Sequence, residues 1–438
     1  MNRSEFPRRR KRLMDMMGDE SVAIIPTAPV RIRNRDAEYP YRPDSDFFYV
    51  TGFPEPEAVA LLIPDRSSGE FVLFCRERDP KMETWNGRRA GLGGACDLYG
   101  ADDAFPISDL DDILPGLLED RERIYYTMGH DIAFDQRVVG WVTQVRSKGR
   151  AGVSAPDEFI ALTHLLHEMR LFKSRAEIQA MRRAAKIAAE AHKRAMRICS
   201  PGMKEYEIEA ELVHEFMRRG ARSPAYSPIV GGGLNGCILH YTENSDELRD
   251  GDLLLIDAGA EYDGYASDIT RTFPVNGGFS PAQREVYEVV LEAQLAAIRE
   301  VRPGNHWNDP HDAAVRVLTE GLVELGILDG RVRTLIREQA YADYYMHRTG
   351  HWLGMDVHDV GDYKLEGDWR MLEPGMVLTV EPGLYFQPRR GLAKKWWNIG
   401  VRIEDDVLVT PGSPEILSAD APKSAGDIEA LMARGRAA

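Results

Sequence analysis

The chain has 438 residues, of which 43% are hydrophobic and 29% are charged, a composition typical of a soluble globular protein. This length exceeds what one ordinary hydrophobic core holds, so we expect two domains. The formal net charge of −15 argues against nucleic acid or an anionic membrane as the main partner, and no apolar run reaches the roughly eighteen residues needed to span a bilayer.

The amino-terminal segment and the cysteines both point to the cytoplasm. The first twenty residues are basic, but they include acidic residues and contain neither an apolar core nor a small-residue cleavage site. We expect them to form an amphipathic helix. The four cysteines, Cys75, Cys96, Cys199 and Cys237, show no paired spacing, as is typical of reduced thiols in an intracellular protein.

Short apolar runs alternate with helical or loop stretches over the first part of the chain. The runs are SVAIIPT, FFYVTGF, AVALLIP, FVLFC and RIYYTM. This alternation predicts a small α/β domain with its own sheet, which we place at residues 1–170. The segment TWNGRRAGLGGA has no clear strand before it and no helix after it, so we expect a flexible surface loop and no phosphate-binding site.

Alanine and charged residues then recur at helical spacing over residues 156–170 and 173–198, which marks a domain junction. Ser174, followed three residues later by Glu177, predicts a capping box at the start of the second helix. The histidines of this helical region are expected on helix surfaces rather than as ligands: His164, His167, His192 and His214.

The remainder of the chain, residues 171–438, is expected to form an α+β domain. Two long helices are expected near residues 281–301 and 306–325. Apolar strands precede and follow them: SPIVGGG, LLLIDAGAEY, VLTVEPGLYF and GVRIEDDVLVT. Strands, then helices, then strands again favour this layout over alternating βαβ units.

One stretch of this domain, LLLIDAGAEYDGYASDITRTF, reads as an apolar strand, a tight turn and a returning strand. A two-residue turn at Asp263 and Gly264 would set the register of the hairpin. Asp257 would then pair with Thr270, and Asp268 would be its diagonal neighbour on the same face, roughly 7–8 Å away at the backbone. Two such carboxylates suit a cation between them. A one-residue bulge would instead put them on opposite faces, and two solvated aspartates are the alternative.

Three further segments carry residues that packing does not explain. They place His347, His351 and His358 in HRTGHWLGMDVHD, Glu381 at the end of the strand in VLTVEPGLYF, and Glu404 within the strand GVRIEDDVLVT beside Arg402. Buried glutamates need an ion pair or a metal. Arg402 can neutralise one carboxylate but not four, so the set favours a pair of divalent cations with His351 as the single nitrogen ligand.

The segments ILHYTEN, IDAGAEYDGYASDITRTF, TGHWLGMDVHD, TVEPGLYF and GVRIEDD resemble, in this order, the motifs of the pita-bread metallopeptidases, and most closely those of the aminopeptidase P family. DAEYPYRPDSDFFYVTGF is similar to that family's amino-terminal domain, so the resemblance covers nearly the whole chain. It implies a pita-bread catalytic domain, two divalent ions that are often manganese, and a homotetramer or homodimer. The metal ligands it implies are Asp257, Asp268, His351, Glu381 and Glu404, with Asp268 and Glu404 bridging the two ions.

The resemblance also implies roles for residues around the metals. His358 would contact the substrate carbonyl, and Glu381 would move a proton from the nucleophilic water to the leaving nitrogen. His240 and His347 would line the pocket around the substrate's proline. Arg402 would orient neighbouring carboxylates.

Three other positions match the family's pattern less firmly. Tyr363 would lie near the site. Asp36 and Trp85 would shape the substrate entrance, partly from a neighbouring subunit, and ordinary surface residues are the alternative for these two. The sequence around Arg370 does not decide whether a basic group closes the substrate groove. The basic aromatic segment from Gln387 to Asn398 is either part of the groove rim or a simple loop.

The implied reaction is hydrolysis of the bond between an amino-terminal residue and a following proline, through a hydroxide that bridges the two ions. Four carboxylates and one imidazole suit manganese but do not exclude cobalt, iron or zinc. A prolidase, which cleaves only Xaa-Pro dipeptides, is the alternative within the same chemistry. A methionine aminopeptidase fits less well, because the amino-terminal domain would be surplus. A catalytically inactive pita-bread binding module would be expected to lack a metal carboxylate, and none is missing.

Overall fold

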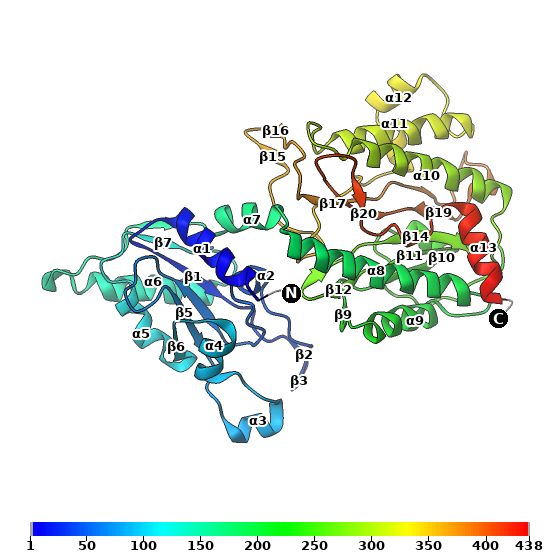
Figure 1. Cartoon of the computed structure of the whole chain (residues 1–438). Helices are drawn as coiled ribbons and strands as arrows, with labels where there is room; N and C mark the ends of the chain where they lie inside the picture. The colour runs from blue at the N-terminus through cyan, green and yellow to red at the C-terminus, as the bar shows by residue number, and fades with distance from the viewer. Residues whose placement is uncertain (1–2, 437–438) are drawn as a thin grey trace. The chain divides into compact units, whose positions relative to one another are not determined.

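The computed structural model describes residues 3–436 of the chain (Figure 1). The chain divides into two compact units, Met1–Met169 and Arg170–Ala438. Within the described residues, no helix combines the length and the apolar character that a membrane crossing requires.

The first unit is built on one six-stranded mixed sheet with the strand order β6-β5-β4-β1-β7-β8. Its strands are β1 (Ser21–Pro26), β4 (Val59–Leu62), β5 (Phe71–Cys75), β6 (Asp103–Pro106), β7 (Arg123–Tyr125) and β8 (Glu158–Ile160). A separate hairpin joins β2 (Ile32–Asn34) to β3 (Ala37–Glu38). The helices are α1 (Glu5–Met17), α2 (Ser45–Thr51), α3 (Pro80–Asn86), α4 (Gly91–Tyr99), α5 (Leu110–Leu117), α6 (Ile132–Arg146) and α7 (Thr163–Leu171). The sheet packs against α5 and α6 through an apolar core, which confirms the predicted α/β domain.

Two segments of the first unit differ from the prediction. The run FFYVT forms α2 and not a strand, because Asp44 caps it by accepting the Phe47 N–H and Gly52 ends it in the left-handed conformation. Phe47 and Val50, three residues apart, are then buried on one helix face. The glycine-rich run GLGGA begins α4, so the expected surface loop is wrong there.

The second unit combines short antiparallel sheets with long helices. Its strands are β9 (Ser223–Pro224), β10 (Ile229–Gly232), β11 (Leu253–Asp257), β12 (Ala260–Tyr262), β13 (Tyr265–Ala266), β14 (Thr270–Pro274), β15 (Lys364–Leu365), β16 (Asp368–Trp369), β17 (Val377–Val380), β18 (Gly383–Phe386), β19 (Ile399–Arg402), β20 (Asp405–Leu408) and β21 (Glu415–Ile416). Its helices are α8 (Arg175–Ile198), α9 (Glu205–Arg218), α10 (Pro281–Glu300), α11 (Asp309–Glu324), α12 (Val332–Arg337) and α13 (Ala425–Arg436). Its three-stranded sheets are β10-β11-β14, β13-β12-β9 and β17-β20-β21, and β15-β16 and β18-β19 form two-stranded sheets. Apolar residues of β10, β11, β14, β18 and β19 pack with those of α8 and α10 in one core, and β10, β11, β14 and β19 lie between the two helices (Figure 1). Apolar residues of β17 and β20 belong to a second cluster.

Helix α8 bears out one prediction and overturns another. Ser174 accepts from the Glu177 N–H and Glu177 accepts from the Ser174 N–H, which confirms the capping box. His192 is fully buried, so its expected place on the helix surface is wrong. One of its ring nitrogens lies 3.0 Å from the Ala258 carbonyl oxygen, which ties α8 to the end of β11. Its neighbours in the helix are alanines, and their small size lets α8 approach the strands closely enough to bury an imidazole.

Candidate active site

The hairpin that follows β11 has the predicted register. Asp257 pairs with Thr270 and Tyr262 pairs with Tyr265, so the two pairings share one register without a bulge. Asp263 and Gly264 form the turn, and both have positive φ, 52° and 79°, as a type I′ turn requires. Asp257 and Asp268 therefore lie on the same face.

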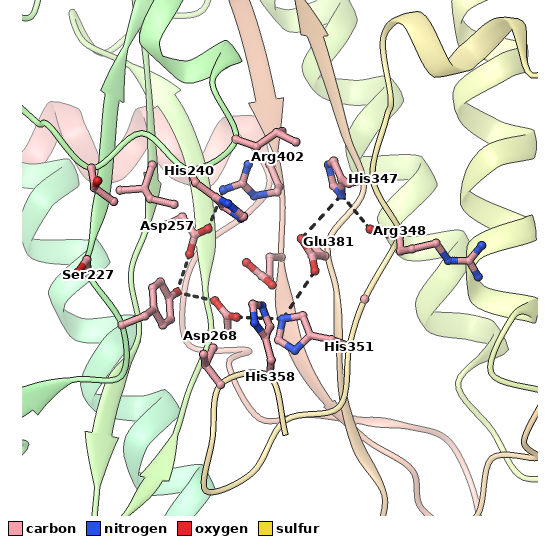
Figure 2. A pocket seen from close by; sticks show the side chains of 17 residues that line it. Ser227, His240, Asp257, Asp268, His347, Arg348, His351, His358, Glu381 and Arg402 are labelled. Carbon is pink, nitrogen blue, oxygen red and sulfur yellow. Dashed lines mark hydrogen bonds and ion pairs between the residues drawn. The ribbon is translucent and has the colours of Figure 1, made fainter. Parts of the chain in front are cut away.

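A tyrosine outside the hairpin joins these two carboxylates. The Tyr226 hydroxyl lies 2.5 Å from Asp257 Oδ1 and also contacts Asp268 (Figure 2). Burial raises the pKa of Tyr226 well above its ordinary value, and the two carboxylates add to the shift, so the phenol stays protonated. Tyr226 precedes β10 in an irregular segment, and no motif in the sequence pointed to it.

His351 and Glu404 complete a compact group with Asp268. A ligand atom from each of the three lies within 4.8 Å of the others. His351 Nδ1 donates to the Trp352 carbonyl at 2.9 Å, which leaves Nε2 free of hydrogen in the neutral ring and 3.3 Å from Asp268 Oδ2. The Thr270 hydroxyl donates to Glu404 at 2.7 Å and orients that carboxylate.

The strand ends explain why these residues meet. Glu381 directly follows β17, and its N–H donates to the Thr349 carbonyl, beside the segment that carries His351. Glu404 does not lie within a continuous strand as predicted but in the break between β19 and β20, where its N–H donates to the Thr270 carbonyl. Glu381 and Glu404 thus each lie where the hydrogen-bond ladder between strands is interrupted, and their side chains can turn toward the other ligands there.

The carboxylates of this cluster are removed from solvent with too little positive charge beside them, and this dominates their pKa values. Arg402 donates to Asp257 at 2.6 Å and is the permanent cation of the group. Burial raises the pKa of Glu381 to about 7, raises that of Glu404 well above its ordinary value, and raises that of Asp257 in spite of Arg402.

His351 and Asp268 shift in the opposite sense. Burial lowers the pKa of His351, but its contacts with Asp268 and Glu381 outweigh that effect and raise it to about 9. Burial raises the pKa of Asp268, but the hydrogen bond and charge of His351, together with Tyr226 and Arg402, outweigh that effect, so the pKa is lowered. In the absence of other cations, an imidazolium therefore supplies the positive charge that the carboxylates lack.

These residues fit divalent metal ions. Two buried carboxylates, Asp268 and Glu404, and two half-buried ones, Asp257 and Glu381, converge with one imidazole on one space, which offers a mostly oxygen donor set suited to hard cations. Bound cations would remove the charge deficit that raises the pKa values of Glu381 and Glu404, and would allow His351 to be neutral.

The same pKa values predict how metal binding depends on pH. Because His351 carries a proton below about pH 9 and Glu381 below about pH 7, ions must displace these protons. We expect the affinity of the metal-free protein for Mn²⁺ to rise with pH between 6 and 9, by about tenfold per unit for each proton displaced. Calorimetric titration in buffers of different ionisation enthalpy measures the proton release. An affinity that stays constant over this range would contradict the assignment.

A cavity of about 470 Å³ opens over the cluster. Its walls contain the five candidate ligands, three of the predicted histidines and Arg402: Asp257, Asp268, His351, Glu381, Glu404, His240, His347, His358 and Arg402. The His358 ring meets the His351 ring edge to face, with centroids 4.4 Å apart. His347 Nε2 lies 2.8 Å from the Tyr385 hydroxyl, and its Nδ1 donates to the Arg348 carbonyl (Figure 2).

Other predicted residues lie elsewhere. Tyr363 does not line the cavity: its hydroxyl accepts from the Trp352 N–H, and its ring stacks on the Trp352 ring at an interplanar angle of 2°. Asp36 and Trp85 belong to the first unit and are exposed, Trp85 to 83%. Arg370 is 4% exposed and packs over Phe172.

The segment from Gln387 to Asn398 is likewise absent from the cavity wall. Trp396 in it is buried, Lys395 lies over the Trp396 ring, and Arg389 lies over Tyr344 and pairs with Asp343. Trp396 and Arg389 therefore pack within the second unit, whereas Arg390, Lys394 and Lys395 are exposed.

Two buried residues lie behind the ligands, and the sequence indicated this place for neither of them. The Asp406 carboxylate accepts from the Asp268 N–H at 3.0 Å and holds the backbone of that ligand. His192 reaches Ala258, the residue after Asp257. Neither position carries a signal in the sequence, because only the packing of α8 and β20 against the hairpin brings these side chains to it.

Comparison with known proteins agrees with this geometry. The model of metallopeptidase family M24 matches residues 179–411, and that of the aminopeptidase P amino-terminal domain matches residues 6–125. Xaa-Pro aminopeptidase of Escherichia coli is 49% identical over 437 residues, which cover 100% of this chain and 99% of that protein.

Solved structures share the whole architecture. Pseudomonas aeruginosa aminopeptidase PepP is 59% identical, with a TM-score of 0.99 over 100% of this chain and 99% of that one. Zinc-substituted Escherichia coli aminopeptidase P in complex with product is 49% identical, with a TM-score of 0.97 over 100% and 99% of the two chains. The expected α+β fold is therefore confirmed, with the small α/β domain followed by a pita-bread domain. The chain belongs to metallopeptidase family M24 and, within it, to the aminopeptidase P (Xaa-Pro aminopeptidase) group.

Proposed function

We propose that this protein hydrolyses the bond between an amino-terminal residue and a following proline, using two divalent metal ions. The observation that carries this proposal is the convergence of four carboxylates and His351 on one cavity, with Arg402 as the permanent cation of the group. The relatives named Xaa-Pro aminopeptidase align over the whole chain, which supports the peptide specificity.

We assign the metal ligands as Asp257, Asp268, His351, Glu381 and Glu404, with Asp268 and Glu404 shared between the ions. Bound together, the ions would activate a water molecule as nucleophile and stabilise negative charge on the peptide oxygen. Manganese is the proposed metal because oxygen donors dominate the set.

We propose that Glu381 carries the proton. It lines the cavity with the other candidate ligands, so its carboxylate can accept a proton from the nucleophilic water and release it again. The leaving nitrogen of an Xaa-Pro bond bears no hydrogen and must receive one to depart as a secondary amine. We propose that Glu381 delivers it.

His347 and His358 of the cavity wall are proposed to bind the substrate as neutral rings. Burial and the neighbouring His351 lower the pKa of His358, so its ring can donate an N–H to the carbonyl oxygen without carrying charge. Burial lowers the pKa of His347 to about 3, and both its nitrogens are already hydrogen-bonded, which leaves its ring face for an apolar group such as proline. His240 faces the same cavity.

A longer peptide fits the cavity better than a dipeptide. A prolidase needs a cation that caps the carboxylate of the proline. Arg402 is already paired with Asp257, and Arg370 is buried over Phe172. The Arg348 guanidinium points away from the other labelled side chains and donates to Asn308 (Figure 2). Among the described residues that line the cavity, the lysine and arginine side chains are Arg348 and Arg402, and each already has a hydrogen-bond partner.

Several wider expectations belong to the same proposal. We propose that the first domain, residues 1–170, contributes Asp36 and Trp85 to the substrate entrance in a homotetramer or homodimer. The 83% exposure of Trp85 supports this, because so large an apolar side chain is usually covered by a partner. We propose that Tyr363 supports the site through Trp352. A cytoplasmic location is proposed because all four cysteines are unpaired.

One assay tests the reaction and its metal dependence together. Dialysis against a chelator is expected to abolish cleavage of an Xaa-Pro-Yaa tripeptide, and added Mn²⁺ is expected to restore it. Co²⁺, Fe²⁺ and Zn²⁺ added in parallel would identify the preferred ion.

The same preparation is then given an Xaa-Pro dipeptide. Hydrolysis of the dipeptide alone would identify a prolidase. Undiminished tripeptide cleavage by protein shown to be metal-free would remove the mechanism.

A further inference from the structure

A single buried carboxylate outside the cavity holds the loop that carries His240. Glu205 is the first residue of α9, and its exposure is 0%. The loop connects β10 to β11 and contains little regular structure beyond one turn of 3-10 helix at Gly233–Cys237. Its course therefore depends on contacts with the rest of the unit.

Four donors from β10 and this loop converge on the Glu205 carboxylate. Oε1 accepts from the Gly232 N–H at 2.8 Å and from Asn235 Nδ2 at 3.1 Å. Oε2 accepts from the Tyr241 hydroxyl at 2.7 Å and from the Asp246 N–H at 2.9 Å. The donors come from both sides of His240, so one side chain closes the loop on itself.

The charge of Glu205 makes this closure strong. A buried carboxylate is costly unless its oxygens are hydrogen-bonded, and hydrogen bonds to an ionised group are about twice as strong as neutral ones. No lysine, arginine or histidine pairs with Glu205 among the described residues. The loop donors are therefore what offsets the burial of its charge, and opening the loop would remove them together.

Tyr241 connects the Glu205 carboxylate to the residue that lines the cavity, His240. It is 7% exposed and packs with Ile229, Leu255 and Tyr385, whereas His240, the preceding residue, is exposed and lines the cavity. Within the described part of the chain, the His240 ring has no hydrogen bond that would hold it. Its place in the cavity wall (Figure 2) is thus set by the backbone, which Tyr241 holds to Glu205 through their hydrogen bond.

We propose that Glu205 is a positioning residue: its carboxylate fixes the backbone at His240 and so holds that imidazole against the bound substrate. This inference rests on the proposed function in one respect, the contact of His240 with substrate. The loop anchorage itself is independent of the reaction.

A double-mutant cycle tests the link to His240. Glu205→Gln preserves size but replaces one acceptor oxygen with an amide that cannot accept from the Asp246 N–H. We expect kcat/KM for an Xaa-Pro-Yaa tripeptide to fall by about tenfold, mainly through KM, the size of effect that coupled neighbours show. In the His240→Ala background the same change is expected to have little further effect. Equal losses in both backgrounds would overturn the proposal.

Two variants sharpen this comparison. Glu215→Gln is the matched control, because Glu215 lies on the same helix, is 3% exposed and pairs with Arg219, away from the loop. It is expected to leave kcat/KM unchanged. Tyr241→Phe removes one donor and keeps the ring, so it is expected to reproduce part of the Glu205→Gln effect even if that variant folds poorly.

Hydrogen–deuterium exchange provides a readout that does not depend on activity. In Glu205→Gln, amides of residues 233–247 are expected to exchange faster, while α10 and the β17–β20 pair keep their protection. Glu215→Gln is expected to leave this loop unaffected. Unchanged exchange in Glu205→Gln would contradict the anchorage, whereas an inactive wild-type protein would contradict only the proposed function.

Discussion

Asp268→Asn is expected to abolish turnover while the protein stays folded. Asp268 contacts His351, Tyr226 and the Asp406 carboxylate, through its side chain or its N–H, and belongs to the compact group of ligand atoms. Loss of its charge weakens the attraction for both proposed ions at once. Since loss of a partner outside the ligand shell already lowers metal affinity or activity by about 10–100-fold, we expect kcat/KM to fall by more than about 100-fold.

Metal content and folding must be measured beside activity. We expect the variant to retain less metal after dialysis than the wild type, with an unchanged circular dichroism spectrum. Asp252→Asn is a suitable control, because Asp252 precedes β11 and lies at the end of the β11–β14 pair that is opposite to Asp268. If Asp268→Asn kept its metal and most of its turnover, the assignment of Asp268 as a shared ligand would be wrong.

Asp405→Asn is expected to lower the free energy of unfolding by about 3–5 kcal/mol, because it leaves buried cations without a counter-charge. Asp405 and Arg271 both have 0% side-chain exposure and are 2.7 Å apart. Lys423 and Gln294 also donate to the same carboxylate, at 2.7 and 2.8 Å. Urea unfolding followed by fluorescence gives the difference between variant and wild type.

A second ion pair in the chain has the same length as the Asp405–Arg271 pair but is exposed, so comparing the two separates the effect of burial from that of distance. Arg182 and Glu415 are also 2.7 Å apart but are 44% and 39% exposed, so Glu415→Gln is expected to cost less than about 1 kcal/mol. Equal losses for the two variants would show that burial of the Asp405 pair adds nothing.

The Asp405 network also has a defined pH dependence. Burial raises the pKa of Asp405, but Arg271 and Lys423 outweigh it and lower that pKa to about 2. Because the pKa is lower in the folded than in the unfolded chain, the stabilisation is complete above the ordinary value of 3.8 and is lost as pH falls toward 2. The stability difference between wild type and Asp405→Asn should therefore shrink over that window.

Local chemistry explains which elements were predictable. The capping box depends on Ser174 and Glu177, three positions apart, and the turn depends on the adjacent residues Asp263 and Gly264, so short-range preferences decide both. The run FFYVT was predicted as a strand because its β-branched and aromatic residues favour strands. It forms a helix because Asp44 caps its start and Gly52 ends it.

The candidate site shows the same division. Acidic side chains at strand ends are visible in a sequence, since burial of a carboxylate demands a partner. The role of His192, Tyr226 or Glu205 is not visible, because each acts on a segment 27 to 66 residues away whose position depends on packing.

The amino-acid sequence by itself determined the register of the Asp257–Asp268 hairpin and the set of charged residues that need compensation, because both follow from neighbours along the chain. Only the tertiary structure decided which partner each charged group has: His351 lies against Asp268, Arg402 pairs with Asp257, and Glu205 accepts hydrogen bonds from a loop. The physical reason is that the pKa and the hydrogen bonding of a buried group depend on what surrounds it in space, and α8, α9 and the strand ends supply those surroundings from distant parts of the chain.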